Sequence, residues 1–115
     1  TIVPLRSGLA ICNKPRVKSK RYLPPCMKDW EIIWVEDVTA QVFYQYPYAS
    51  KWIGLNMLVV NPTTVIMDTA QLELSKILEK KGFTVIPHTL RHSRTLGGGH
   101  HCVTLDTWRE ARAYA

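Results

Sequence analysis

A cysteine beside two histidines closes a run of three glycines near the end of the sequence. Gly97–Gly99 is followed directly by His100, His101 and Cys102. Glycine is typical where the backbone needs unusual angles or where a ligand must come close to it. A cysteine next to such a turn, with histidine nearby, is a candidate thiolate nucleophile. The same residues also fit a plain turn that leads to a small buried cysteine.

The two adjacent histidines raise the question of a metal site. Neighbouring residues rarely converge on one ion, and no further Cys or His pair stands at ligand spacing. His88 and His92 have no evident place in such a site. We therefore expect no metal and no cofactor.

The cysteine content and the charge restrict the class of protein. The sequence has an odd number of cysteines, namely Cys12, Cys26 and Cys102. They are widely spaced and form no CxxC pair, which favours reduced thiols in a cytoplasmic protein. The net charge of +6 would suit an anionic partner, but the one dense basic run, from Arg16 to Arg21, is short. Without a nucleic-acid motif, a signal peptide or a membrane-sized apolar run, we expect no nucleic-acid or membrane partner.

The elements that must position these side chains form an α/β pattern. Its first half holds short strands, one of them a continuous apolar run typical of a buried strand. A short helix or turn then precedes a hairpin, whose turn is marked by Asn61-Pro62-Thr63-Thr64. The expected strands are Ile2–Leu5, Gly8–Cys12, Glu31–Val35, Asn56–Val60, Val65–Met67 and Phe83–Pro87, and Ser50–Leu55 is the short helix or turn.

One helix stands out in the second half. Asp68 or Thr69 is expected to cap it, it is expected to run to Lys81, and Gly82 is the expected C-cap. Apolar side chains recur at helical spacing and predict one buried face, made of Ala70, Leu74, Ile77 and Leu78. Hairpin, helix and final strand together predict a compact ββαβ unit, and we find no internal repeat in the 115 residues.

Three segments resemble motifs of one enzyme family. Leu96–Asp106 resembles the C-terminal active-site motif of the arginine:glycine amidinotransferases, a Gly-Gly-Gly-aromatic-His-Cys run in which His100 here replaces the aromatic residue. Ala49–Asn56 resembles the family's Ser-Ser-Lys-Trp-Leu-x-x-Asn stretch, and Asn13–Arg16 resembles its Asn-Pro-x-Arg segment. The three matches follow the family's order at close to its spacing.

The resemblance implies a fold and a place within it. Family members are several times longer and consist of five ββαβ-type modules around a pseudo-fivefold axis, the α/β-propeller or pentein fold. Residues 1–115 would then be a single C-terminal fragment or module of a larger catalytic domain. The missing N-terminal modules of the same enzyme are the expected protein partner, and a homodimer is left open.

The resemblance also implies a reaction. Cys102 would attack the guanidinium carbon of L-arginine, release ornithine and pass the amidino group, in ping-pong order, to an acceptor amine such as glycine or a natural-product intermediate. Arg16 would hold the substrate carboxylate, and Ser50 would lie near the amino-acid end of the substrate. Gly98, Gly99 and His101 would shape the pocket around the thiol.

One part of the family's machinery is missing from the sequence. The family's acid/base motif, His-x-Asp, lies just ahead of the strand that Thr1 begins, so the isolated fragment is expected to be inactive.

Two alternatives stay open. A guanidine-modifying hydrolase of the same fold would pass the group to water, although the Ser-Lys-Trp segment and the His-Cys-x-Thr run favour the transferase. A basic, noncatalytic interaction module is the alternative from another class.

Overall fold

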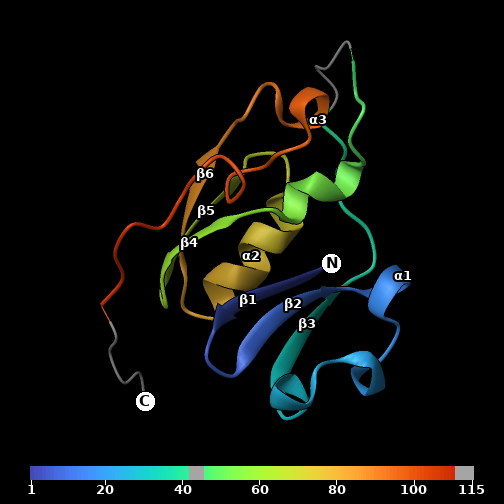
Figure 1. The fold of residues 1–115 in the computed structure, drawn as a ribbon, viewed down its shortest axis with the longest axis vertical. Helices are drawn as coiled ribbons and strands as arrows, with labels where there is room; N and C mark the ends of the chain where they lie inside the picture. The colour runs from blue at the N-terminus through green and yellow to red at the C-terminus, as the bar shows by residue number, and fades with distance from the viewer. Residues whose placement is uncertain (42–45, 111–115) are drawn as a thin grey trace. The chain divides into compact units, whose positions relative to one another are not determined.

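A computed structural model describes residues 1–41 and 46–110 of the chain. The chain divides into two compact units, Thr1–Asp37 and Val38–Ala115, and each contains a three-stranded sheet among its described residues (Figure 1). Within these described ranges, every helix is too short or too polar to cross a membrane.

The first unit is built on a buried central strand. Strand β1 (Ile2–Arg6) pairs antiparallel with β2 (Leu9–Asn13), and β2 pairs parallel with β3 (Glu31–Val35). All five residues of β2 are buried, as its apolar run predicts. Short helical segments connect β2 to β3, namely α1 (Lys14–Val17), η1 (Lys20–Tyr22) and η2 (Pro25–Met27).

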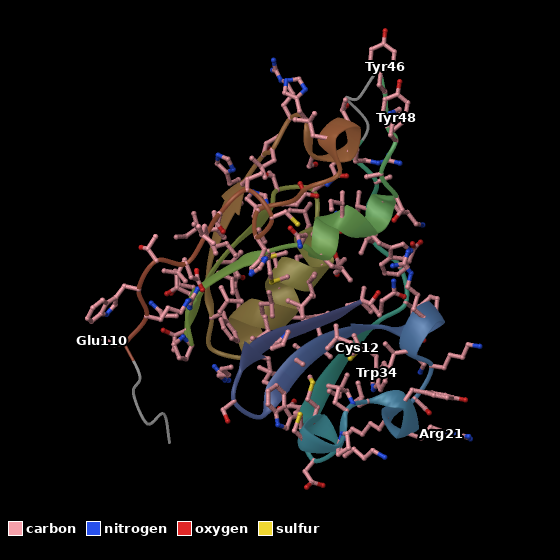
Figure 2. The ribbon with its side chains drawn as sticks, in the orientation of Figure 1. Cys12, Arg21, Trp34, Tyr46, Tyr48 and Glu110 are labelled. Carbon is pink, nitrogen blue, oxygen red and sulfur yellow. The ribbon has the colours of Figure 1, made fainter. Side chains whose placement is uncertain are left out.

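Side chains from this connection close the core of the first unit. Cys12 of β2 packs with Val17 and Met27, and Trp34 of β3 packs against them. Figure 2 shows Cys12 and Trp34 within the unit and Arg21 pointing away from it. Burial raises the pKa of the Cys12 thiol, so this cysteine stays protonated and serves the core.

The second unit is the predicted ββαβ unit. Strand β4 (Leu58–Asn61) pairs antiparallel with β5 (Thr64–Asp68), and β5 pairs parallel with β6 (Thr84–His88). Helix α2 (Leu72–Lys80) makes the crossover. The 3-10 helix η3 (Lys51–Leu55) precedes β4, and the short helix α3 (Ser93–Leu96) follows β6.

Helix α2 differs from its prediction at its start and on one face. It begins at Leu72 instead of following Asp68 or Thr69, because Asp68 is the buried last residue of β5. Leu74 and Leu78 are buried as predicted, whereas Ala70 precedes the helix and Ile77 is 39% exposed. The helix ends at Lys80 with Lys81 as its C-cap, one residue earlier than predicted, and Gly82 follows in the left-handed region at a φ of +90°.

The two units repeat one design, which the sequence does not reveal. The two antiparallel strand pairs have the same register, at a constant offset in residue number. In the first unit the paired residues are Val3–Ile11, Pro4–Ala10 and Arg6–Leu9, and in the second they are Leu58–Ile66, Val59–Val65 and Asn61–Thr64. Both hairpins carry an irregularity at the same place, and both central strands pair parallel with the strand after the crossover. The repeat is therefore a feature of strand register, which the structure shows and the residue identities do not.

Candidate active site

The glycine run begins as the end of a helix. Helix α3 ends at Leu96, and its C-cap is Gly97, whose φ of +74° lies in the left-handed region that glycine adopts without strain. The N–H groups of Gly97 and Gly98 both donate to the carbonyl oxygen of Ser93, at 2.8 and 3.2 Å. The turn that leads to the cysteine is thus fixed at its first residue.

Asn56 holds the other end of the same turn. Its carbonyl oxygen accepts from the N–H of His101 at 3.3 Å, and its side-chain Oδ1 accepts from the N–H of Cys102 at 3.1 Å. Gly99 packs directly on this residue, because a Cβ at position 99 would lie 2.6 Å from Asn56 Cβ and 2.9 Å from its carbonyl oxygen. Only glycine fits between the turn and Asn56.

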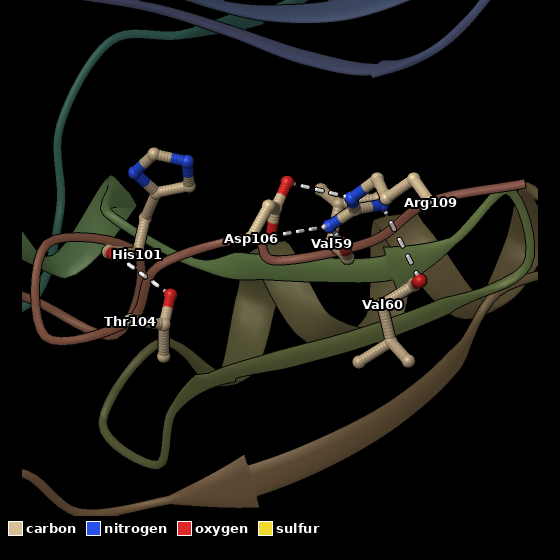
Figure 3. A network of polar contacts seen from close by, with 6 residues as sticks. All are labelled: Val59, Val60, His101, Thr104, Asp106 and Arg109. Carbon is tan, nitrogen blue, oxygen red and sulfur yellow. Dashed lines mark hydrogen bonds and ion pairs between the residues drawn. The ribbon is translucent and has the colours of Figure 1, made fainter.

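The turn then closes on itself and leaves the thiol at the surface. The N–H of Val103 donates to the carbonyl oxygen of Gly99 at 3.2 Å. Thr104 donates to the carbonyl oxygen of His101 through both its N–H and its hydroxyl, at 3.1 and 2.8 Å (Figure 3). Cys102 is exposed in this ordered turn, so the expectation of a buried structural cysteine does not apply to it.

The chain after the cysteine is clamped to the sheet. Arg109 donates to the carboxylate of Asp106 at 2.7 Å and to the carbonyl oxygens of Val59 and Val60 at 2.7 and 3.4 Å (Figure 3). The hydrogen bond from Arg109 holds the pKa of the Asp106 carboxyl below its usual value. The chain on both sides of Cys102 is therefore held by hydrogen bonds.

Ser50 lies on a segment that is tied to the helix before the glycine run. Its Oγ accepts from the N–H of Trp52 at 3.2 Å and caps η3. The N–H of Ala49 donates to the carbonyl oxygen of Arg94 at 2.7 Å, and Arg94 Nε donates back to the carbonyl oxygen of Ala49 at 3.0 Å. Helix α3 thus links the Ser50 segment to the Cys102 turn.

Two histidines meet beneath the turn. His88, at the end of β6, and His100 share a hydrogen bond of 3.1 Å between Nδ1 and Nε2, and their rings are close to perpendicular. Burial and the neighbouring His88 lower the pKa of His100, while Asp68 acts in the opposite direction. His100 is therefore neutral and acts as a packing residue, in the place where the family motif has an aromatic side chain.

A buried polar network supports η3. Asp68 Oδ2 accepts from Gln41 Nε2 at 2.6 Å and from Gln71 Nε2 at 2.9 Å. Gln71 also exchanges two hydrogen bonds with the backbone of Thr39. Gly54 of η3 packs directly on the Gln71 side chain, since a Cβ at position 54 would lie 2.5 Å from Gln71 Nε2. Sequence reasoning missed this network and placed Asp68 at a helix start.

The remaining predicted residue, Arg16, belongs to the first unit. Its N–H donates to Asn13 Oδ1 at 3.3 Å, which caps α1, and its guanidinium donates to the hydroxyl of Thr1 at 3.2 Å. The side chain is exposed, and its predicted role toward a substrate carboxylate stays a prediction. Across residues 1–41 and 46–110, no three His, Cys, Asp or Glu side chains gather as metal ligands.

Known proteins resemble the chain over nearly its whole length. It is 46% identical, over 97% of its residues, to inosamine-phosphate amidinotransferase 1 of Streptomyces griseus. The solved structure of an inosamine-phosphate amidinotransferase from that organism superposes on 99% of the chain with a TM-score of 0.88 and 43% identity. The mitochondrial glycine amidinotransferase of Xenopus tropicalis is 38% identical over 61 residues. No protein-family model matches the chain.

The repeated ββαβ-type units thus match modules of the α/β-propeller, or pentein, fold of these structures, as the resemblance predicts. These matches confirm the resemblance of the chain to the amidinotransferase family. It spans 32% of the Streptomyces griseus relative in sequence and 33% of the solved structure.

Proposed function

We propose that the protein containing this chain transfers the amidino group of L-arginine to an acceptor amine, with Cys102 as the nucleophile. The observation that carries the proposal is the exposed Cys102 in a glycine turn held on Asn56. An ordered turn can present a thiolate to a planar guanidinium at a fixed angle, whereas a thiol on a mobile loop would lose much of that advantage.

The proposed reaction has two half-reactions. The Cys102 thiolate attacks the guanidinium carbon, the bond from this carbon to the side-chain nitrogen of arginine breaks, and that nitrogen takes up a proton as ornithine leaves. The acceptor amine then attacks the carbon of the amidino-cysteine and loses a proton. The carbon–sulfur bond breaks and restores the thiolate.

Substrate-binding roles are proposed for single residues, as the resemblance implies them. Arg16 offers an exposed guanidinium fork, which pairs with a carboxylate through two parallel hydrogen bonds. Ser50 caps η3, so its hydroxyl has a fixed position and its proton remains available to a ligand. The pocket next to the thiol is proposed to be shaped by the backbone, not the side chains, of Gly98, Gly99 and His101.

The relatives differ in the acceptor that their names specify. Inosamine phosphate and glycine stand in the names of two of them. This chain departs from the family motifs at Ala49 and His100. We propose that these two residues change which acceptor amine is preferred.

The proton donor for the leaving amine is proposed to come from residues outside this sequence. General acid/base assistance is worth about 10²- to 10⁴-fold in rate. A polypeptide of these 115 residues alone is therefore expected to show no measurable turnover, and turnover by it would contradict the proposal.

Mass spectrometry of the full-length protein after incubation with L-arginine tests the function. We expect an adduct of amidino mass on the peptide that contains Cys102, its absence in Cys102→Ala, and its persistence in the matched control Cys26→Ala. Added amines should discharge the adduct and reveal the acceptor. Release of citrulline instead would identify the hydrolase, and turnover by Cys102→Ala would refute the nucleophile.

A further inference from the structure

Asn56 stands at a rigid junction directly beneath the Cys102 turn. Its N–H donates to the carbonyl oxygen of Ile53 at 2.9 Å and ends η3. The residues on either side, Leu55 and Met57, are each only 2% exposed, so the backbone at this point is anchored in the core. Strand β4 follows at Leu58, two residues later than predicted, because Asn56 belongs to this junction.

From this junction Asn56 contacts three consecutive parts of the turn. Its Cβ packs against Gly99, its carbonyl oxygen accepts a hydrogen bond from the N–H of His101, and its Oδ1 accepts one from the N–H of Cys102. The last contact fixes the backbone of the nucleophile itself. A side chain of a different length could not reach the N–H of Cys102 while Gly99 stays packed on its Cβ.

The side-chain contact needs only an acceptor, and aspartate would supply a stronger one. A carboxylate accepts a hydrogen bond from a backbone N–H more strongly than an amide does, in the same shape. However, it would put a negative charge within a few ångströms of the thiol and disfavour the thiolate. An uncharged acceptor is therefore the side chain that holds this backbone without opposing the nucleophile.

We propose that Asn56 is the positioning residue of the Cys102 nucleophile and that its neutral amide is required for the thiolate. The inference rests on the proposed function of Cys102. It assigns to Asn56 a task in the reaction, apart from its place in the fold.

Several other ionisable groups lie in or near the turn. His101 is exposed, Asp106 is paired with Arg109, and the buried His100 is hydrogen-bonded to His88. Asp68, which also acts on His100, is held by two glutamines. A carboxylate at position 56 would be a new charge directly at the backbone of Cys102.

The test compares Asn56→Asp and Asn56→Ala with the wild type in the full-length protein. Alkylation of Cys102 by iodoacetamide is followed across pH by peptide mass spectrometry, together with kcat/KM for amidino transfer. Cys26, an exposed thiol of the first unit, is the internal control. Asn61→Ala is the matched control variant, because Asn61 Oδ1 also accepts a backbone N–H, that of Thr63, in the same region of the chain.

We expect Asn56→Asp to move the pH profile of Cys102 alkylation upward by about one unit or more, the usual effect of a like charge. Asn56→Ala should keep the midpoint of the profile and lower kcat/KM by about 10- to 100-fold, the cost of a misplaced reacting group. Cys26 alkylation and the Asn61→Ala variant should behave as in the wild type.

Opposite outcomes overturn the inference. An unchanged pH profile in Asn56→Asp would show that the neutral amide is not required, and full kcat/KM in Asn56→Ala would remove the positioning role. These results are separate from the proposed function. If Cys102→Ala still transferred the amidino group, the function would fail while the alkylation profiles still reported on Asn56.

Discussion

Replacement of Gly99 by alanine tests the close contact between the glycine turn and Asn56. The added methyl group would lie 2.6 Å from Asn56 Cβ, 2.7 Å from its Oδ1 and 2.9 Å from its carbonyl oxygen. Gly99 does not have a positive φ, so the substitution adds no backbone strain and acts through the contact alone. Two of the three contacts are with atoms that the backbone fixes, so they cannot move aside as the end of a flexible side chain would.

The size of the effect follows from these distances. Carbon atoms favour a separation of about 3.5–4.0 Å, so the turn must retreat by about 1 Å. That shift stretches the hydrogen bonds of His101 and Cys102 to Asn56, now 3.3 and 3.1 Å long, beyond hydrogen-bond range. Two lost hydrogen bonds at about 0.5–1.5 kcal/mol each predict a destabilisation of about 1–3 kcal/mol. A nucleophile displaced by about 1 Å predicts a loss of activity of about 100-fold.

Urea unfolding and amidino-transfer kinetics of the full-length protein measure both effects. Gly98→Ala is the matched control, because a Cβ at position 98 meets only Cys102 Cβ, at 3.1 Å, and a shift of a few tenths of an ångström relieves it. We expect Gly98→Ala to be milder in both assays. Wild-type stability and activity in Gly99→Ala would refute the steric reasoning.

Three further substitutions test the network, the histidine pair and the clamp. Gln71→Ala removes a donor from the buried Asp68 carboxylate, and we expect urea unfolding to show a loss of about 1–3 kcal/mol. Because the pKa of His100 is lowered in the folded protein, the unfolded chain binds a proton more readily at this residue. The free energy of unfolding should therefore fall as the pH drops below about 6.5. His100→Phe should weaken this pH dependence, measured as the melting temperature between pH 7 and pH 5. Arg109→Ala breaks an exposed pair with Asp106, so stability should change by less than about 1 kcal/mol while amide exchange around Asp106 rises.

One control variant and two refuting outcomes complete these predictions. Lys76→Ala breaks the exposed pair with Glu73 on α2 and should leave exchange around Asp106 unchanged. A Gln71→Ala protein as stable as the wild type would show that the Asp68 network does not support η3. An unaltered pH dependence in His100→Phe would assign the acid sensitivity to other groups.

Local patterns in the sequence predicted most of the elements. Glu31–Val35 forms the expected strand, the turn at Asn61-Pro62-Thr63-Thr64 joins the expected hairpin, and Gly82 follows the expected helix with a positive φ. These features depend on alternation, turn chemistry and capping within a few residues, so the sequence is sufficient for them. The repeat of the two units was not visible, because it is preserved in strand register and not in residue identity.

Polar residues at strand ends were the main source of error. Aspartate is a common residue at helix N-caps, yet Asp68 lies buried at the end of β5. Gln71 is the residue directly before the helix. The difference is set by Gln41, which reaches Asp68 from a distant part of the sequence. A local pattern contains no information about such a partner.

The sequence by itself determined that a thiol follows a glycine turn and that a ββαβ unit carries it. Tertiary structure decided how that thiol is held. Asn56 meets Gly99 and Cys102, and His88 meets His100, only because the sheet brings the end of β6 and the start of β4 to one turn. Turn and strand preferences act over a few residues, whereas these contacts join residues far apart in the chain, so packing of the whole unit sets them.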